Sequence, residues 1–266
     1  MIADLPWLEM AHTGRLGERP VCFLRETAST NDVALALAGD GAVGGTVVVA
    51  ECQSLGRGRL GREWLSPPGV GLYCSFILRP QLEPADLPKL TLGAGLAASR
   101  AVATITSQRP QLKWPNDLWL AGKKVGGILA EARLAPGRPL VILGIGVNVN
   151  TAQDAFPVDL RDKVASLAAQ SGREFARSAL LAALADEVMA MVARCECEGF
   201  AGILADWREL DATRGRALEW LTQSGAVIRG LSLGLDEGGQ LWIRDAAGTA
   251  HEVLSGDISL AGCGRE

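Results

Sequence analysis

Residues 111–149 read QLKWPNDLWLAGKKVGGILAEARLAPGRPLVILGIGVNV. Short apolar segments within this stretch predict four strands, at 111–114, 118–120, 125–131 and 140–149. Ala121-Gly122-Lys123 separates two of these strands and is typical of a hairpin turn. Strands that follow one another through short turns, with helices kept in separate blocks, favour an α+β fold over strict strand–helix–strand alternation.

The sequence on either side of this stretch extends the same fold. Apolar segments predict buried strands at 46–50 and 71–78. Helices are predicted at 33–38, after the capping residue types of 27–32 and before Gly39, at 87–105, and over most of 163–207. The chain therefore predicts a mixed β-sheet with packed helices.

The pattern changes near residues 211–215, where helical periodicity gives way to short strands. These strands are predicted at 217–221, 227–234, 241–245 and 251–254, with turns at Ser224-Gly225, Glu237-Gly238-Gly239 and Ala247-Gly248. We therefore expect two domains, residues 1–213 and 214–266. The second is expected to be a small β-barrel that draws stability from its neighbour.

The composition argues against several classes of protein. The chain has 266 residues, 48% of them hydrophobic, and a net charge of −4, whereas general nucleic-acid-binding proteins are usually basic. Its six cysteines include no C-x-x-C pair and it has two histidines, which disfavours a zinc site and histidine acid–base chemistry. We expect reduced thiols and a cytoplasmic location. No signal-peptide pattern and no apolar stretch of about 20 residues occurs, so no membrane span is expected.

Residues 51–62 read ECQSLGRGRLGR, a segment in which arginines alternate with glycines. Glycine lets a backbone approach a ligand closely, and arginine offers a planar fork of donors to phosphate or carboxylate oxygens. A solvated basic turn or an Arg-Gly RNA-binding patch would share this composition. The flanking Gln53 and Trp64 favour a lid over a small anionic ligand.

Ser29-Thr30-Asn31 precedes the first predicted helix. Short polar side chains of this kind suit the polar head of a ligand in a mostly apolar pocket. The same residue types also cap helices. Both roles are compatible, because the N-terminus of a helix attracts ligand oxygens.

Lys113-Trp-Pro-Asn-Asp117 ends at a turn, where Asp117 is a candidate Mg²⁺ ligand or the acceptor of an Asx turn. Lys124 follows, either as a ligand-binding cation or as a surface lysine of the hairpin. Gly126-Gly127 would leave room for a ligand beside it.

Gly144-Ile-Gly-Val-Asn148 places two glycines in an otherwise apolar strand. This pattern indicates either a close approach by another group or a bulge followed by an Asn turn. Asn148 at the end of the strand suits an amide-like or adenine edge, because its side chain carries both a donor and an acceptor.

Taken in this order, the motifs resemble those of the biotin–protein ligases over about residues 22–260. The resemblance implies that biotin and Mg-ATP form biotinyl-5′-AMP and pyrophosphate. A lysine of a biotin carboxyl carrier domain then attacks this mixed anhydride and becomes biotinylated. The resemblance also implies a catalytic fold akin to class II aminoacyl-tRNA synthetases, followed by an SH3-like module.

The same resemblance implies roles for individual residues. It implies that Arg59, Lys124 and Asp117 take part in catalysis. The residues implied to contact biotin are Ser29, Thr30, Asn31, Gln53, Arg57, Gly58, Arg59, Lys124, Gly126, Gly127 and Gly144. The residues implied to contact the adenylate are Arg59, Arg62, Trp64, Lys113, Asn116, Lys124 and Asn148. Asp117 would serve the metal or the incoming lysine.

These residue types suit the chemistry. A carboxylate that attacks an α-phosphate brings two anions together, so cations such as Arg59 and Lys124 must offset their repulsion. No general base is needed for this step, because the carboxylate is already ionised at neutral pH. A mobile loop that excludes water would protect the hydrolysable adenylate.

The sequence departs from some relatives in two places. Only 28 residues precede Ser29, too few for a winged helix-turn-helix, so we expect no operator binding and no nucleic-acid partner. The segment 151–164 contains no tryptophan to stack on adenine, and Phe156 is the candidate substitute. The protein is expected to be a monomer or a homodimer.

Two alternatives remain open at this point. A lipoate–protein ligase shares the chemistry and an Asn-Asp stretch followed by Lys and Gly, although the Arg-rich loop favours biotin. A non-enzymatic Arg-Gly RNA-binding module is the alternative from a different class, and the net charge of −4 argues against it.

Overall fold

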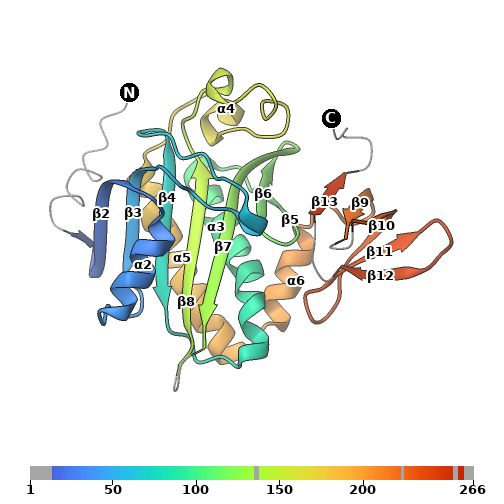
Figure 1. Cartoon of the computed structure of the whole chain (residues 1–266), viewed down its shortest axis with the longest axis horizontal. Helices are drawn as coiled ribbons and strands as arrows, with labels where there is room; N and C mark the ends of the chain where they lie inside the picture. Colours follow the sequence, from blue (N-terminus) through green and yellow to red (C-terminus); the bar gives the residue numbers. More distant parts are fainter. Residues whose placement is uncertain (1–13, 135–137, 223–224, 254–256, 261–266) are drawn as a thin grey trace.

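The computed structural model describes residues 14–134, 138–222, 225–253 and 257–260. Its main feature is an eight-stranded sheet in the order β1-β2-β3-β4-β8-β7-β6-β5 (Figure 1). The strands are β1 (Arg15–Leu16), β2 (Arg19–Thr27), β3 (Val47–Gln53), β4 (Gly71–Leu78), β5 (Gln111–Lys113), β6 (Asp117–Leu120), β7 (Lys123–Arg133) and β8 (Leu140–Asn148). The sheet is mixed, because β2 and β3 pair in parallel and the other neighbours pair antiparallel.

Helices cover both faces of this sheet (Figure 1). They are α2 (Thr30–Gly39), α3 (Leu90–Thr106), α4 (Leu167–Ser171), α5 (Arg177–Glu198) and α6 (Ala201–Glu209). Successive side chains of a strand point to opposite faces. Val48 of β3 accordingly packs with Ala34 and Ala38 of α2, whereas Val47 and Val49 join the larger core that includes α3 and α5.

The predicted fold class, a mixed sheet with packed helices, is confirmed. The helix expected at 87–105 starts at Leu90, because the preceding 3₁₀ helix η2 occupies Pro84–Lys89. The helical region expected at 163–207 is divided into three helices. Gly172 and Gly199 adopt positive φ of 71° and 72° and end α4 and α5, as glycine commonly does after a helix.

The hairpin turn predicted at Ala121-Gly122-Lys123 is confirmed between β6 and β7. Ala121 and Gly122 have φ of 49° and 80°, the positive values that a two-residue turn needs to match the twist of its strands. The strand after the turn begins at Lys123, earlier than the expected residue 125, because pairing continues up to the turn. The turn thereby fixes the position of Lys124 opposite Trp119 of β6.

The C-terminal unit is a five-stranded antiparallel sheet in the order β12-β11-β10-β9-β13. Its strands are β9 (Ala217–Leu221), β10 (Val227–Leu235), β11 (Leu241–Asp245), β12 (Ala250–Val253) and β13 (Asp257–Leu260). The expected small β unit is therefore present, with β13 as an additional strand. Among the described residues, no pairing of β12 with β13 closes the sheet into a barrel. Ser224 and Leu254, which belong to an expected turn and strand, lie outside the described residues.

Hydrogen bonds join β5 to the chain that follows α6, and join Trp114, just after β5, to the C-terminal unit. Leu112 N–H donates to Leu210 O, and Ala212 N–H donates to Leu112 O, at 2.8 and 2.9 Å. The Trp114 indole donates to Gly239 O at 3.1 Å. The segment that follows β5 is thus held against both units. Within the described ranges, none of the helices has the length and apolar character needed to cross a membrane.

Candidate active site

A cavity of about 150 Å³ opens on the face of the large sheet that carries α2. The segment after β3 passes in front of this face (Figure 1). The cavity gathers most of the expected site residues: Ser29, Thr30, Asn31, Gln53, Arg57, Gly58, Arg59, Arg62, Trp64, Lys113, Asn116, Asp117, Lys124, Gly127 and Gly144. Residues spread over more than 100 positions of the sequence therefore meet at one site.

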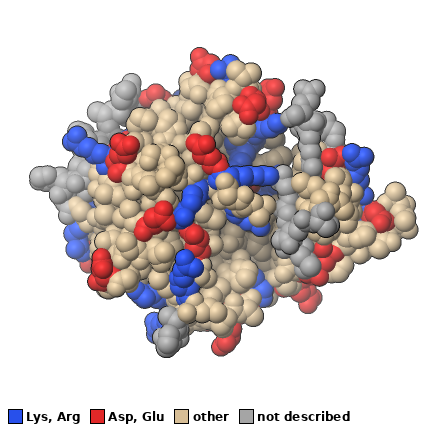
Figure 2. All heavy atoms as spheres, in the orientation of Figure 1, with Lys and Arg blue, Asp and Glu red and all other residues tan. Residues whose placement is uncertain are grey.

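A second cavity of about 550 Å³ adjoins the first. Both are lined by Arg62, Trp64, Lys113, Asp117 and Lys124. The second cavity also contains Asn148 and Phe156, which the sequence analysis assigned to adenine. On this side of the molecule, Lys and Arg side chains form a band across the middle that leads into a hollow (Figure 2).

Neutral polar side chains form one end of the first cavity. The backbone N–H and the hydroxyl of Thr30 donate to Gln53 Oε1, at 2.8 and 3.1 Å. Ser75 Oγ lies 2.7 Å from Thr30 Oγ1 and 2.6 Å from Asn31 Oδ1. Ser29 is the N-cap residue of α2, but its side chain makes no capping hydrogen bond. The polar residues at this helix start are therefore turned to the cavity rather than to the helix end.

Glycines of β7 and β8 make room for two larger side chains. A Cβ atom on Gly144 would lie 2.3 Å from Asn31 Oδ1, and one on Gly146 would lie 2.5 Å from Trp64 Nε1. The close approach expected from the Gly-Ile-Gly pattern is thus observed, and the approaching groups are Asn31 and Trp64. At both positions any side chain would collide with a wall of the cavity.

Gly126, like Gly127, was expected to contact biotin. It does not line the first cavity, and a Cβ there would meet Leu118 Cδ1 at 2.9 Å. Gly127 does line the cavity, and a Cβ there would lie 3.2 Å from Trp64 and 3.6 Å from Lys124 Nζ. The two glycines differ because neighbouring residues of a strand point to opposite faces.

A charged pair forms the other end of the first cavity. Lys124 Nζ lies 2.7 Å from Asp117 Oδ1, with 29% and 17% of the two side chains exposed. Lys124 Nζ also lies 5.4 Å from the centre of the Trp64 ring, and Lys113 Nζ lies 5.1 Å from that of Trp119. The β6–β7 hairpin brings this pair together, so Lys124 is not a free surface lysine of the hairpin.

The Gly-Arg segment folds into a small hairpin of its own. Gly58 N–H donates to Arg62 O at 2.7 Å, and Trp64 N–H donates to Gly56 O at 2.8 Å. The 3₁₀ helix η1 (Arg59–Gly61) forms its tip, where Leu60 has a φ of 58° and is 63% exposed. Positive φ is uncommon for leucine, so the tip is held in a locally unfavourable conformation.

Neither the thiol nor the phenol of the cavity wall is available as a nucleophile or base at neutral pH. Burial raises the pKa of the Cys74 thiol and of the Tyr73 hydroxyl. Tyr73 also donates its proton to Pro67 O at 3.0 Å. The site is therefore suited to holding and neutralising anions rather than to covalent catalysis.

Several residues in and around the two cavities were not expected from the sequence. Ser75, in the predicted strand 71–78, is fully buried and contacts Thr30 and Asn31, which line the first cavity. Asp32 and Glu131 bind Arg57, at 2.6 and 3.2 Å. Trp119 and β13 line the second cavity, and no motif indicated that the C-terminal unit would contribute to it.

Comparison with known proteins agrees with this geometry. Residues 23–150 match the model of the biotin/lipoate A/B protein ligase family. The chain is 36% identical over 243 residues to the biotin–[acetyl-CoA-carboxylase] ligase of Paracoccus denitrificans, covering 88% of this chain and 100% of the relative. The chain belongs to the biotin protein ligase family. Within this family, the corresponding ligase of Mycobacterium tuberculosis is 32% identical over 251 residues, or 91% of this chain and 89% of the relative.

A solved biotin protein ligase has the same fold. The enzyme from Aquifex aeolicus in complex with biotin and ATP superposes with a TM-score of 0.78 and 33% sequence identity, over 91% of this chain and 98% of that chain. Together with the named relatives, this likeness favours a biotin ligase over the lipoate alternative and over a non-enzymatic RNA-binding module.

The donor set of this biotin protein ligase fits a magnesium ion that arrives with a nucleotide. Mg²⁺ commonly binds one or two carboxylates together with phosphate oxygens. Asp117 supplies a carboxylate at the border of the two cavities. In the described part of the chain, no group of three or more His, Cys, Asp or Glu side chains is arranged to hold a metal without such help.

Proposed function

We propose that this biotin protein ligase joins biotin to ATP as biotinyl-5′-AMP, releases pyrophosphate, and then transfers biotin to a lysine of a biotin carboxyl carrier domain. The observation that carries the proposal is the division of the site. A small cavity with a neutral polar end and a cationic end opens into a larger cavity that contains cations and aromatic side chains.

Biotin would occupy the smaller cavity. Its ureido ring is neutral and polar, and it matches the end formed by Thr30, Asn31 and Gln53, where Ser75 lies within hydrogen-bonding distance of two of them. Its carboxylate would then point to the other end, toward Lys124. This orientation brings the reacting oxygen to the border with the second cavity, because Lys124 lines both.

ATP would occupy the larger cavity, with its phosphates among the cations shared by both cavities. Arg62 and Lys113 lie at this border, and Arg59 lines the smaller cavity. Asn148 and Phe156 line the larger cavity and not the smaller one, and adenine would bind beside them. A magnesium ion held by the phosphates and Asp117 would neutralise further negative charge there.

In the first step a carboxylate oxygen of biotin attacks the α-phosphorus, and the bond to pyrophosphate breaks. Lys124 and Arg59 would reduce the repulsion between the two anions as they approach, and such preorganised charges are usually the largest contribution to catalysis. In the second step the amine of the acceptor lysine attacks the acyl carbon and AMP leaves. Asp117 would orient that amine once Lys124 binds the phosphate.

The proposal also covers the acceptor protein, the cellular location and the domains of the enzyme. The acceptor is a biotin carboxyl carrier domain, in keeping with the names of the relatives. A net charge of −4 supports a function without nucleic acid, and the free thiols of the five described cysteines support the cytoplasm. We propose residues 1–213 as the catalytic domain and 214–266 as the C-terminal domain, acting as a monomer or a homodimer.

One experiment tests the proposed function directly. The protein is incubated with a biotin carboxyl carrier domain, biotin and Mg-ATP, and the carrier is weighed by mass spectrometry. We expect the mass of one biotinyl group on one lysine. The same mixture with lipoate in place of biotin is the control. Modification by lipoate alone, or no biotin-dependent exchange of labelled pyrophosphate into ATP, would contradict the proposal.

A further inference from the structure

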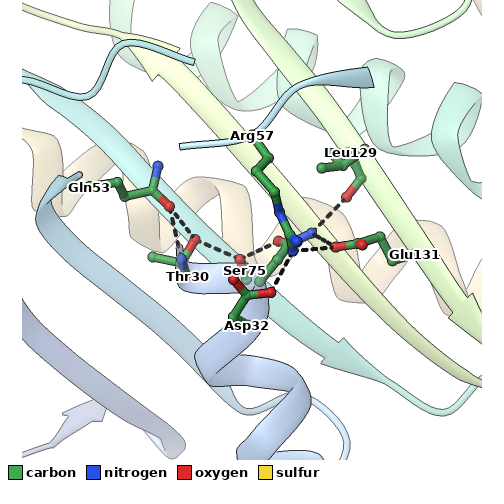
Figure 3. Close-up of polar contacts among 8 residues, drawn as sticks. Thr30, Asp32, Gln53, Arg57, Ser75, Leu129 and Glu131 are labelled. Atoms are coloured by element: carbon green, nitrogen blue, oxygen red, sulfur yellow. Dashed lines mark hydrogen bonds and ion pairs between the residues drawn. The ribbon is translucent and has the colours of Figure 1, made fainter. Parts of the chain in front are cut away.

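Arg57 connects the Gly-Arg loop to two separate elements of the catalytic unit (Figure 3). Its Nη2 donates to Asp32 Oδ1 of α2 at 2.6 Å and to Glu131 Oε2 of β7 at 3.2 Å. These partners are 25 and 74 residues away in the sequence. We call Arg57, Asp32 and Glu131 the loop clamp.

Glu131 also connects the clamp to the polar end of the cavity, although it does not itself line either cavity. Its Oε2 also accepts a hydrogen bond from Asn31 Nδ2 at 2.7 Å. Asn31 is 5% exposed, and its Oδ1 lies 2.6 Å from Ser75 Oγ. A continuous series of close polar contacts therefore runs from Gln53 at the polar end, through Ser75, to the arginine of the loop (Figure 3).

The clamp closes the loop across the sheet. The loop leaves β3, whereas Glu131 lies on β7, and β4 and β8 separate these two strands. Backbone hydrogen bonds hold the hairpin of this loop together, but its tip is exposed and has a leucine at positive φ. A contact on the far side of the cavity is what such a loop needs to remain over a ligand.

We propose that Asp32 and Glu131 are positioning residues that hold the Gly-Arg loop closed through Arg57 and so retain biotinyl-5′-AMP until the acceptor lysine arrives. This inference deepens the proposed function and rests on it. It assigns Arg57 to loop closure rather than to direct contact with biotin. Through Asn31, Glu131 also ties closure of the loop to the polar end where the biotin ring would bind.

The three side chains are partly exposed, at 43%, 53% and 37% for Arg57, Asp32 and Glu131. Ion pairs of this kind contribute little to global stability because water and salt screen them. Their loss is therefore expected to change how often the loop opens while the folded structure persists. This combination makes retention of the adenylate the informative measurement.

The test uses the full-length protein with Asp32→Asn, Glu131→Gln and the double variant. Labelled adenylate is formed from biotin and ATP without a carrier, and its release is followed by gel filtration and by biotinylation of a bystander protein. Loss of both ion pairs is expected to raise the release rate by about 5- to 30-fold. The rate of biotin-dependent pyrophosphate exchange is expected to stay within about threefold of wild type.

Asp186→Asn is the matched control, because Asp186 also forms a carboxylate–arginine pair, at 2.8 Å with Arg19, outside both cavities. It should leave adenylate release unchanged. Glu131→Asp retains the charge and should recover part of the retention that Glu131→Gln loses. In wild type, release should rise with salt concentration, whereas in the double variant this dependence should be weaker.

A second measurement does not depend on activity. Trypsin cleaves after arginine, and the loop contains Arg57, Arg59 and Arg62. Limited proteolysis without ligands should cut the loop faster in the double variant than in wild type or Asp186→Asn. Equal cleavage and equal adenylate retention in wild type and the double variant would overturn the clamp. Absence of biotin-dependent pyrophosphate exchange in wild type would instead overturn the proposed function, while the proteolysis result would still decide the clamp.

Discussion

Lys124 and Arg57 are both cations of the cavity wall that are paired with carboxylates, but they are held in different ways. Lys124 and its partner Asp117 are seven residues apart on one hairpin, and 29% and 17% of their side chains are exposed. Arg57 lies on a glycine-rich loop, and its partners Asp32 and Glu131 are more exposed and distant in the sequence. One cation is fixed by local structure, whereas the other fixes the loop that carries it.

The difference bears on what each charge is able to do. A cation on a rigid hairpin in a partly water-excluded site acts strongly on developing charge and needs no rearrangement during the reaction. An exposed cation on a loop is screened by solvent, so it is better suited to a contact that forms and breaks. We therefore assign the chemical step to Lys124 and loop closure to Arg57.

The largest effect is expected for Lys124→Ala. Removing this charge should lower the rate of adenylate formation by about 10²- to 10³-fold, by analogy with the loss of one oxyanion donor. Biotin-dependent pyrophosphate exchange measures this rate, and circular dichroism checks that the fold is retained. Pyrophosphate release by the variant at close to the wild-type rate would remove Lys124 from the chemical step.

Arg59→Ala separates the neighbouring arginine of the loop from Arg57. Arg59 is expected to bind the adenylate itself. Its loss should raise the rate of adenylate release by about 10- to 100-fold, which corresponds to the free energy of one hydrogen bond to a charged group. The released adenylate would label lysines of bystander proteins, which a streptavidin blot detects. Normal transfer to the carrier with no such labelling would count against this role.

Gly144→Ala probes the polar end to which the clamp is connected. The added Cβ would lie 2.3 Å from Asn31 Oδ1, and hydrogen bonds to Ser75 and Glu131 keep Asn31 from moving away. Overpacking of this kind costs about 1–3 kcal/mol. We expect weaker biotin binding by roughly 10-fold in isothermal titration.

Gly95→Ala in α3 is the control for this substitution, because the nearest atom to its Cβ is Leu112 Cδ2, at an ordinary 3.5 Å. It should leave biotin affinity unchanged. Similar affinities for the Gly144 and Gly95 variants would show that Asn31 is free to move and that the polar end is less rigid than we infer.

The smallest effect is expected for a carboxylate paired with arginines outside the two cavities. Hydrogen bonding from Arg194 lowers the pKa of Asp206, and Arg100 also contacts it, at 2.8 Å. Because the folded pKa is depressed, this stabilisation is present above the usual carboxyl pKa and is lost as the pH falls through the folded value. Asp206→Asn should lower the free energy of unfolding by about 1 kcal/mol or less at pH 7.

Urea denaturation of wild type and Asp206→Asn at neutral and at acidic pH measures this difference. The two proteins should converge in stability under acidic conditions, where Asp206 of the wild type becomes protonated. An equal difference at both pH values would show that the effect of the substitution is not electrostatic.

Some features of the fold and of the site follow from short stretches of sequence. The strand 71–78 is apolar along its length because both of its faces are buried, and the Ala121-Gly122 turn follows from the backbone angles that a tight hairpin needs. The short polar side chains of Ser29-Thr30-Asn31 and the glycines of β8 indicated a ligand pocket, because both signals lie within a few neighbouring residues. Gly126, by contrast, does not line the first cavity, because a motif does not reveal which face of its strand a residue occupies.

By itself, the sequence determined the mixed α+β class, the separate C-terminal β unit and the residue types that suit biotin and ATP, since periodicity, turns and motifs are properties of neighbouring residues. Only the tertiary structure decided that Glu131 binds both Asn31 and Arg57, that Ser75 completes the polar end, and that β13 lines the larger cavity. These contacts join residues of distant elements. Their pairing depends on strand order and on the packing of α2 against the sheet, which no short stretch of sequence specifies.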